Sequence, residues 1–383
     1  MIIAGEASGD LHGANLARSM LEKDNDLVIS GIGGTEMAAA GVKLLYDNST
    51  LAVMGIIEVI RGLKYVRAAM NMLEARFRLA RPNLLILIDY PGFNLELARR
   101  AKKYDIPVFY YISPKIWAWR EGRIKRIRKY VDRMAVILPF EKSFYDDRGF
   151  DVDFVGNPLL DEVLTDLPPS VFRARNNISA DAKVIGIMPG SRKQEIAKLL
   201  PIFLQTARML NDTIRNCVFL LPLATTITEA YLEEHIDKAS ELDVRIIKDK
   251  RYEAMASCDA AIAASGTLTL ELAILKVPMV VCYRVSLLTY LLAKPFIKVR
   301  FASLVNLVAG REVVPELLQK QVTLDSIYRE MLPLVINDDA REVMKADLTE
   351  ICDQLGEPGA SKRAADLALQ MMAERKTGDV RFS

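Results

Sequence analysis

The chain begins with Met1-Ile2-Ile3-Ala4-Gly5-Glu6-Ala7-Ser8-Gly9-Asp10, an apolar run followed by a loop with two glycines. A helical pattern follows from Leu11 to Leu21. α/β proteins use such a strand, turn and helix to bring a ligand to the backbone at a helix N-terminus. The spacing is not that of a dinucleotide fingerprint, and Glu6 places a carboxylate where a phosphate loop avoids negative charge. We therefore expect this loop to meet a hydroxyl-bearing or cationic group, with any phosphate held elsewhere.

Apolar runs alternate with amphipathic stretches along the rest of the chain. Besides Met1–Ala4, strands are expected at Leu27–Gly31, Leu84–Asp89, Val108–Ile112, Met134–Leu138, Val152–Val155, Val184–Met188, Cys217–Leu221, Val244–Ile247, Ala260–Ala263 and Met279–Tyr283. Helix-length segments separate these runs. The pattern predicts an α/β fold with right-handed βαβ units and parallel sheets.

The length of 383 residues exceeds one ordinary core and predicts two domains. Pro168-Pro169 and the Arg/Asn-rich residues after it indicate a linker at about residues 160–182. We expect a Rossmann-like domain over residues 1–160, a second over residues 161–345, and a helical segment over residues 346–383 that either packs back on the N-terminal domain or is swapped in a dimer. Two such domains would have parallel sheets facing each other across a cleft.

Composition excludes several classes of protein. Hydrophobic residues make up 51% of the chain and charged residues 26%, which is typical of a globular protein. The four cysteines lack paired spacing and indicate buried free thiols, and the two histidines lack ligand spacing, so neither a His-based metal site nor a Ser-His triad is expected. No apolar run approaches about 20 residues, so no membrane span is expected, and no signal peptide is visible.

Two loops in the second half suggest a nucleotide site. Pro189-Gly190-Ser191-Arg192 follows one predicted strand and Ser265-Gly266-Thr267 follows another, each before a helix. Glycine permits close approach, Ser191 could cap the helix, and Arg192 offers a planar fork to phosphate. Either loop alone could be an ordinary turn or cap, but together with an acid that suits ribose hydroxyls they favour a nucleotide diphosphate site. Its expected residues are Gly190, Ser191, Arg192, Glu195, Ser265, Gly266, Thr267, Thr269 and Glu271.

Asp89 ends the strongly apolar run at Leu84–Ile88 and precedes Tyr90-Pro91. A carboxylate at the carboxyl end of a buried strand is partly desolvated, which raises its pKa toward that of a general base. The alternative is a turn or cap before a helix that starts at Pro91.

Both tryptophans lie in Ser113-Pro114-Lys115-Ile116-Trp117-Ala118-Trp119-Arg120, within a basic stretch over residues 99–133. Aromatic faces with flanking cations suit a sugar ring or an amphiphile, although a packed tryptophan pair beside a solvated basic helix shows the same pattern. Because no further stacking platform or known module is present, no nucleic-acid partner is expected.

The clearest amphipathic segment covers residues 53–73, with Arg61, Lys64 and Arg67 on a face apart from its apolar stripe. Such a helix either packs on the sheet, which we favour, or lies in an anionic membrane surface. A second apolar stretch over residues 287–304 carries Lys294, Lys298 and Arg300. Together they suggest peripheral membrane contact.

From Gly5 to about Leu318, the chain resembles the lipid-A-disaccharide synthases, which are GT-B glycosyltransferases. The resemblance rests on Gly5–Asp10, Leu51–Gly55, Asp89, Ser113-Pro114, Trp117–Arg120, Leu138–Glu141, Pro189–Arg192, Ala264–Glu271 and Asn306–Glu312. The first loop and the tryptophan motif are specific to this family. Where members often have a histidine after Val155-Gly156, this chain has Asn157.

The resemblance implies an inverting enzyme that transfers 2,3-diacylglucosamine from UDP to the 6-hydroxyl of 2,3-diacylglucosamine 1-phosphate (lipid X). It implies neither metal nor cofactor, because the UDP-sugar is a substrate. It also implies a place on the cytoplasmic face of the inner membrane of a Gram-negative bacterium, and a C-terminal segment that can exchange in a homodimer.

For the chemistry, we expect Asp89 as the catalytic base, with Glu6 the second choice. Ser8 and Asn306 would position sugar hydroxyls, Trp117 would contact substrate, and Arg120 would meet the acceptor phosphate. The alternatives are a polyprenyl-acceptor transferase or UDP-GlcNAc 2-epimerase of the same architecture, or a non-enzymatic membrane module.

Overall fold

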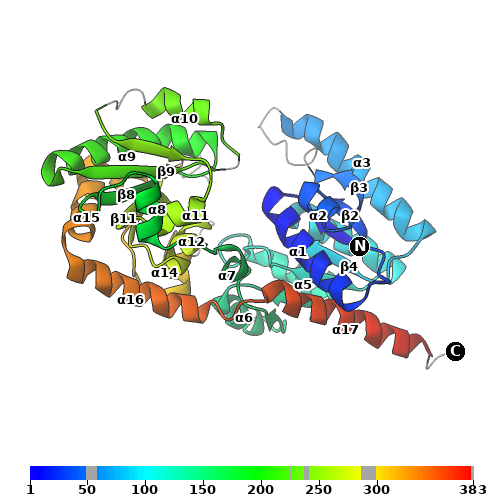
Figure 1. Cartoon of the computed structure of the whole chain (residues 1–383). Helices are drawn as coiled ribbons and strands as arrows, with labels where there is room; N and C mark the ends of the chain where they lie inside the picture. The colour runs from blue at the N-terminus through cyan, green and yellow to red at the C-terminus, as the bar shows by residue number, and fades with distance from the viewer. Residues whose placement is uncertain (49–57, 225, 237–240, 286–298, 381–383) are drawn as a thin grey trace. The chain divides into compact units, whose positions relative to one another are not determined.

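The computed structural model describes residues 1–48, 58–224, 226–236, 241–285 and 299–380 (Figure 1). The chain divides into two compact units: Met1–Pro158 with Leu355–Ser383, and Leu159–Gln354. Each unit is built around one parallel sheet, as the alternation of apolar and amphipathic stretches predicts.

The sheet of the first unit has the order β3-β2-β1-β4-β5-β6-β7, with all pairs parallel. The strands are β1 (Ile2–Ala4), β2 (Ser30–Gly33), β3 (Lys43–Asp47), β4 (Leu85–Ile88), β5 (Val108–Tyr111), β6 (Arg133–Val136) and β7 (Asp153–Phe154). The strand order reverses between β1 and β4. Their C-terminal loops therefore meet at a topological switch point, the usual place for a ligand in an open α/β sheet.

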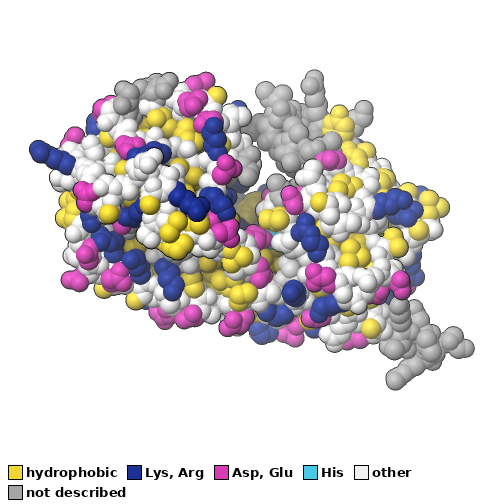
Figure 2. Space-filling model, in the orientation of Figure 1, with side chains coloured by type: hydrophobic (Ala, Val, Ile, Leu, Met, Phe, Trp, Pro, Cys, Tyr) yellow, Lys and Arg dark blue, Asp and Glu magenta, His cyan; other side chains and the backbone are white. Residues whose placement is uncertain are grey.

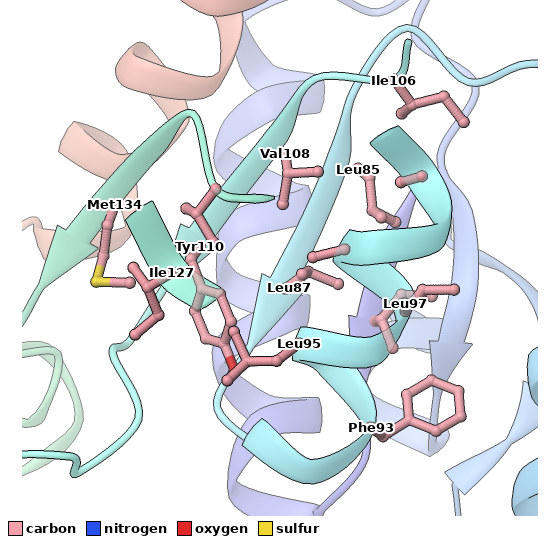
Figure 3. Close-up of a cluster of buried hydrophobic side chains, with 14 of the residues drawn as sticks. Leu85, Leu87, Phe93, Leu95, Leu97, Ile106, Val108, Tyr110, Ile127 and Met134 are labelled. Carbon is pink, nitrogen blue, oxygen red and sulfur yellow. The ribbon is translucent and has the colours of Figure 1, made fainter. Parts of the chain in front are cut away.

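Helices cover both faces of this sheet: α1 (Ala7–Lys23), α2 (Thr35–Ala39), α3 (Glu58–Leu79), α4 (Pro91–Ala101), α5 (Ile124–Tyr130), α6 (Pro139–Asp146) and α17 (Ala360–Val380). On one face, side chains of α4 and α5 pack against Leu85, Leu87 and Tyr110 (Figure 3). On the other face, Ala364, Ala365 and Ala368 of α17 complete a core with α1 and β4. The C-terminal helix is thus part of the N-terminal core, and small residues let it approach closely.

The second sheet has the order β10-β9-β8-β11-β12-β13, again all parallel. Its strands are β8 (Lys183–Met188), β9 (Cys217–Pro222), β10 (Val244–Ile247), β11 (Ala260–Ala264), β12 (Met279–Tyr283) and β13 (Glu316–Leu318). Its helices are α7 (Leu159–Glu162), α8 (Pro169–Arg175), α9 (Lys193–Ile214), α10 (Glu229–Ile236), α11 (Arg251–Ala256), α12 (Leu268–Ile274), α14 (Leu304–Ala309), α15 (Leu324–Ile336) and α16 (Asp338–Gln354). The strand order reverses between β8 and β11.

The linker and one domain boundary differ from those expected. The linker expected at about residues 160–182 instead contributes to α7 and α8, which pack within the second unit. Phe172 is buried there, and Arg173 donates to the Ser257 carbonyl and pairs with Asp259. The boundary expected at residue 345 falls inside α16, because the second unit continues to Gln354.

The sequence pattern does not predict two of the strands, β3 and β13. Both lie at sheet edges, and their residues are half-buried or exposed and do not form an apolar run. All four cysteines are free thiols, as predicted, and Cys217, Cys258 and Cys282 are buried, whereas Cys352 is only half-buried.

The amphipathic segment 53–73 is described in part. Residues 53–57 and the side chains of residues 58–64 lie outside the described part of the structure. Farther along α3, Ala69, Met70 and Leu73 are buried in the core, whereas Tyr65 and Leu79 are exposed. This half of the helix therefore packs on the sheet. Of the second apolar stretch, residues 286–298 likewise lie outside the described part.

Candidate active site

The first candidate site lies at the switch point of the first sheet, where β1 and β4 end side by side with Ala4 opposite Ile88. The next residues along these strands bring Glu6 and Asp89 to the same sheet edge. Asp89 is half-buried, and burial is the main cause that raises its pKa. The negative charge of Glu6 raises it further, while Lys115 and His12 oppose the rise. The structure thus places the two predicted base candidates near enough for the charge of Glu6 to raise the pKa of Asp89.

The turn that carries Asp89 is unusual. Asp89 and Tyr90 both adopt the left-handed conformation, with φ of 43° and 44°. The Asp89 carbonyl accepts hydrogen bonds from the Tyr110 hydroxyl and from Asn94 Nδ2 at 2.8 Å. Asn94 also donates to the Ile88 carbonyl at 3.0 Å. Non-glycine residues in this conformation are strained and persist only when their surroundings hold them, as these buried side chains do.

Gly5 and Asp10 have structural roles in the first loop. A Cβ at Gly5 would lie 2.4 Å from Cδ1 of Tyr90, so only glycine fits under that ring. The buried Asp10 carboxylate accepts from the amides of Gly34 at 2.6 Å, Glu36 at 3.0 Å and Met37 at 3.1 Å. Asp10 therefore fixes the turn after β2.

The helix after this loop begins at Ala7 rather than Leu11. Ser8 consequently lies in its first turn, where it is exposed, and Glu6 is exposed at the N-cap position without a side-chain cap hydrogen bond. The side chains of Ser8 and Glu6 are therefore both accessible. Their contact with a substrate stays a prediction.

A buried carboxylate organises the tryptophan segment. Glu141 is 2% exposed. Its Oε1 accepts from Ser113 Oγ at 2.6 Å and Trp117 Nε1 at 2.9 Å, and its Oε2 accepts from the amides of Ile137 at 3.2 Å and Leu138 at 3.0 Å. Burial raises the pKa of Glu141, and these four donors oppose the rise. Glu141 was not among the expected site residues, although its motif, Leu138–Glu141, was part of the resemblance.

The two tryptophans have different environments. Trp117 is 8% exposed, packs edge-on against Phe140 at 4.9 Å, and uses its indole N–H on Glu141. The predicted contact of Trp117 with substrate therefore has little support, because its ring is buried against Phe140 and its N–H is already hydrogen-bonded. Trp119 is 45% exposed, with the Arg120 guanidinium 4.4 Å from the ring centroid. Exposure of Trp119 and Arg120 leaves a cation and an aromatic face available to a ligand.

The second candidate site lies at the switch point of the second sheet, in the loops after β8 and β11. Gly190 has φ of 105°, and a Cβ there would lie 2.7 Å from Glu195 Oε2. The N-cap of α9 is Arg192 and has no side-chain cap hydrogen bond, so the expectation that Ser191 caps this helix is wrong. The Arg192 side chain is 80% exposed and pairs with Glu195 at 2.8 Å. A guanidinium at the start of a 22-residue helix suits an anionic ligand.

Neighbouring side chains fix the backbone of this loop. Thr226 Oγ1 donates to the Ser191 carbonyl at 2.6 Å, and the Tyr231 hydroxyl donates to the Lys193 carbonyl at 3.0 Å. These hydrogen bonds hold the loop while leaving Arg192 exposed.

The loop after β11 differs in part from expectation. Gly266 and Thr267 are exposed, and a Cβ at Gly266 would meet nothing within 4 Å. Ser265 Oγ donates to the Ala302 carbonyl at 2.8 Å, and the fully buried Thr269 donates to the Gly266 carbonyl at 2.9 Å. Thr269 therefore stabilises the turn instead of offering its hydroxyl to a nucleotide. Glu271 is 8% exposed and forms an ion pair with Arg251.

Asn306 is fully buried, and intrachain partners occupy its carboxamide. Its Oδ1 accepts from the amides of Val313 at 2.8 Å and Val314 at 3.0 Å. Its Nδ2 donates to the Val314 carbonyl at 2.9 Å and to Glu316 Oε1 at 2.8 Å. Through these hydrogen bonds, Asn306 joins α14 to β13. They leave no support for the predicted direct contact of its carboxamide with a sugar.

Among the described residues, no group of three or more His, Cys, Asp and Glu side chains could hold a metal ion. Within the same part of the chain, no helix is long and apolar enough to cross a membrane. Basic and acidic side chains are interspersed on the face that Figure 2 shows.

Sequence comparisons add an independent finding. A family model described as lipid-A-disaccharide synthetase matches residues 1–371. The lipid-A-disaccharide synthase of Syntrophus aciditrophicus is 45% identical over 372 residues, which cover 97% of each chain. That of Geobacter metallireducens is 43% identical over 376 residues, which cover 98% of each chain.

Solved structures share the architecture at much lower identity. UDP-GlcNAc 2-epimerase of Neisseria meningitidis is 13% identical, with a TM-score of 0.59 over 97% of this chain and 99% of that chain. MurG of Acinetobacter baumannii is 14% identical, with a TM-score of 0.60 over 97% of this chain and 99% of that chain. At such identities the likeness shows the fold alone, and the predicted GT-B fold is confirmed.

Proposed function

Because the chain belongs to the lipid-A-disaccharide synthetase family of glycosyltransferases, we propose that it joins two acylated glucosamine units. The donor is UDP-2,3-diacylglucosamine, and the acceptor is the 6-hydroxyl of lipid X. The products are a β-1,6-linked disaccharide 1-phosphate and UDP. The observation that supports this reaction most directly is Asp89, a half-buried carboxylate with a raised pKa at the sheet switch point.

Asp89 acts as the base. Its carboxylate takes the proton of the acceptor 6-hydroxyl as that oxygen forms a bond to the anomeric carbon of the donor. The bond between the anomeric carbon and the β-phosphate oxygen breaks, and its electron pair leaves with UDP. One displacement in line inverts the anomeric centre. A raised pKa brings Asp89 closer to the operating pH and makes it a stronger base.

The second unit holds the donor. Exposed Arg192 and the N-terminus of α9 stabilise the charge that grows on the departing diphosphate. Glu271 accepts hydrogen bonds from the ribose hydroxyls. In this scheme, protein cations and backbone dipoles carry the charge stabilisation without a metal.

The decisive experiment incubates purified protein with UDP-2,3-diacylglucosamine and lipid X and detects the disaccharide 1-phosphate by mass spectrometry. Asp89→Asn is expected to lower kcat by about 10²–10⁴-fold, the usual contribution of a general base. An Asp132→Asn variant is the control at an exposed aspartate of the same unit. If no disaccharide forms and UDP-GlcNAc, supplied in a separate incubation, is converted to its 2-epimer, the epimerase alternative holds instead.

We also propose that α3 contacts the membrane that supplies both acylated substrates. Tyr65 and Leu79 expose apolar surface on α3, and Arg67 is an exposed cation of the same helix. Tyr65→Ser with Leu79→Ser is expected to reduce co-sedimentation with phosphatidylglycerol vesicles, while Val28→Ser, at another exposed apolar position, is expected to leave it unchanged. Equal binding of all three proteins would contradict this contact.

The cytoplasmic location and the homodimer remain predictions from the resemblance.

A further inference from the structure

Glu271 is a buried carboxylate that is tied to one arginine. It lies on α12, shortly after the exposed turn at Gly266 and Thr267, and is 8% exposed. Arg251 is the first residue of α11, and its Nη2 donates to Glu271 Oε2. Because β10 and β11 are parallel, α11 and α12 both begin at the carboxyl edge of the second sheet. The ion pair therefore joins two helix starts at the edge where the nucleotide loops lie.

The charges around Glu271 depend on Arg251. Burial raises the pKa of Glu271, the Arg251 guanidinium lowers it, and the Glu162 carboxylate on α7 raises it again. Tyr252 also faces this group, and its pKa is raised to about 12, so it is a neutral phenol. Arg251 is thus the cation that offsets both burial and the second carboxylate.

Arg251 is itself restrained. Its guanidinium lies 4.8 Å from the centroid of the Tyr252 ring, and its side chain is partly buried. Arginine stays protonated at all physiological pH values and has a planar fork, so it fixes both the charge and the direction of a carboxylate. The pair uses one carboxylate oxygen, and a carboxylate has a second oxygen with which to accept further hydrogen bonds.

We propose that Arg251 is a positioning residue that fixes the Glu271 carboxylate as an anionic acceptor for the ribose diol of a uridine nucleotide. This role rests on the proposed function of Glu271. Arg251 need not touch the nucleotide, because it acts through the carboxylate. Without Arg251, a buried carboxylate beside Glu162 takes up a proton at higher pH and loses acceptor capacity.

The test measures the affinity for UDP by calorimetry from pH 5.5 to pH 8.5, with 2′-deoxy-UDP as the probe that lacks one diol hydroxyl. Arg251→Gln is expected to weaken UDP binding by about tenfold near pH 6 and by less near pH 8, in line with one charged hydrogen bond. In this variant the acid limb of the binding profile should move to higher pH. Its affinity for 2′-deoxy-UDP should fall less than its affinity for UDP. Arg251→Lys restores most of the affinity, because it keeps the charge.

Arg208→Gln is the matched control, since Arg208 forms an exposed ion pair with Glu241 in the same unit. Glu271→Gln supplies the reference for complete loss of the acceptor anion, and melting curves identify unfolded variants. If Arg251→Gln weakens both ligands equally at every pH, or has no effect, Arg251 does not position Glu271. If the wild-type protein binds no UDP at all, the proposed function fails as well, so the two failures are distinguishable.

Discussion

Tyr110 holds Asp89 from the neighbouring strand: its buried hydroxyl donates to the Asp89 backbone carbonyl and secures a residue with φ of 43°. Together with Asn94, this hydrogen bond keeps two consecutive non-glycine residues in a conformation that costs about 1–2 kcal/mol each. Tyr110 also belongs to the core between the sheet and α4 (Figure 3). The position of the proposed base is therefore set by the hydrophobic core.

Tyr110→Phe is expected to retain the packing and remove the hydrogen bond. The free energy of unfolding should fall by about 1 kcal/mol, the usual net value of one hydrogen bond. Because Asn94 still holds the turn, kcat should fall less than in Asp89→Asn. Urea denaturation and steady-state kinetics measure both effects. A fully active and equally stable variant would show that Asn94 alone suffices.

Glu6→Gln tests the coupling of the two carboxylates. The charge of Glu6 raises the pKa of Asp89, so its neutralisation should lower that pKa. Asp89 then remains ionised to lower pH, and the acid limb of the kcat/KM profile shifts to lower pH. Glu36→Gln, an exposed glutamate in the same unit, is the control. Should Glu6→Gln abolish turnover at every pH, Glu6 would be the base in place of Asp89.

Gly5→Ala is expected to displace the Tyr90 ring, because the new Cβ would lie 2.4 Å from it. Tyr90 follows Asp89 in the strained turn, so activity should fall although no polar group is lost. A second substitution, Tyr90→Leu, relieves the clash and should recover part of the activity in the Gly5→Ala background. Kinetics of the single and double variants give the coupling. Additive losses would mean that Gly5 serves the ligand directly.

Glu141→Gln should destabilise the first unit by about 2 kcal/mol, because an amide nitrogen replaces one oxygen and leaves buried donors without an acceptor. Fluorescence of Trp117, which donates to Glu141, should report a change in its environment. Glu342→Gln at an exposed site is the control in the denaturation experiment. Unchanged stability would mean that the tryptophan segment is held by apolar packing alone.

The sequence correctly predicted those site residues whose place follows from the order of strands and loops along the chain. Loops at the ends of apolar runs contained Glu6 and Asp89 in the first unit and Arg192 in the second, and within each sheet the parallel strands bring such loops to the same edge. The predicted general base accordingly lies at the switch point with a raised pKa.

The sequence predicted poorly where the direction of a side chain decides its role. Thr269, Asn306 and Trp117 have polar groups of the expected kind, but each turns them to an intrachain partner. Those partners come from carbonyls, amides and carboxylates that tertiary packing supplies, so local pattern cannot identify them. Edge strands such as β3 were missed for a related reason, since an edge strand needs no continuous apolar run.

The place of α17 has a consequence for biosynthesis. Ala364, Ala365 and Ala368 complete the core around β1 and β4, yet they are translated after the entire second unit. The N-terminal unit therefore cannot complete this core before α17 is synthesised, and a premature stop codon shortly after Gln354 leaves the core without the side chains of α17. Synthesis of α17 is thus the step that commits the first unit to its native state.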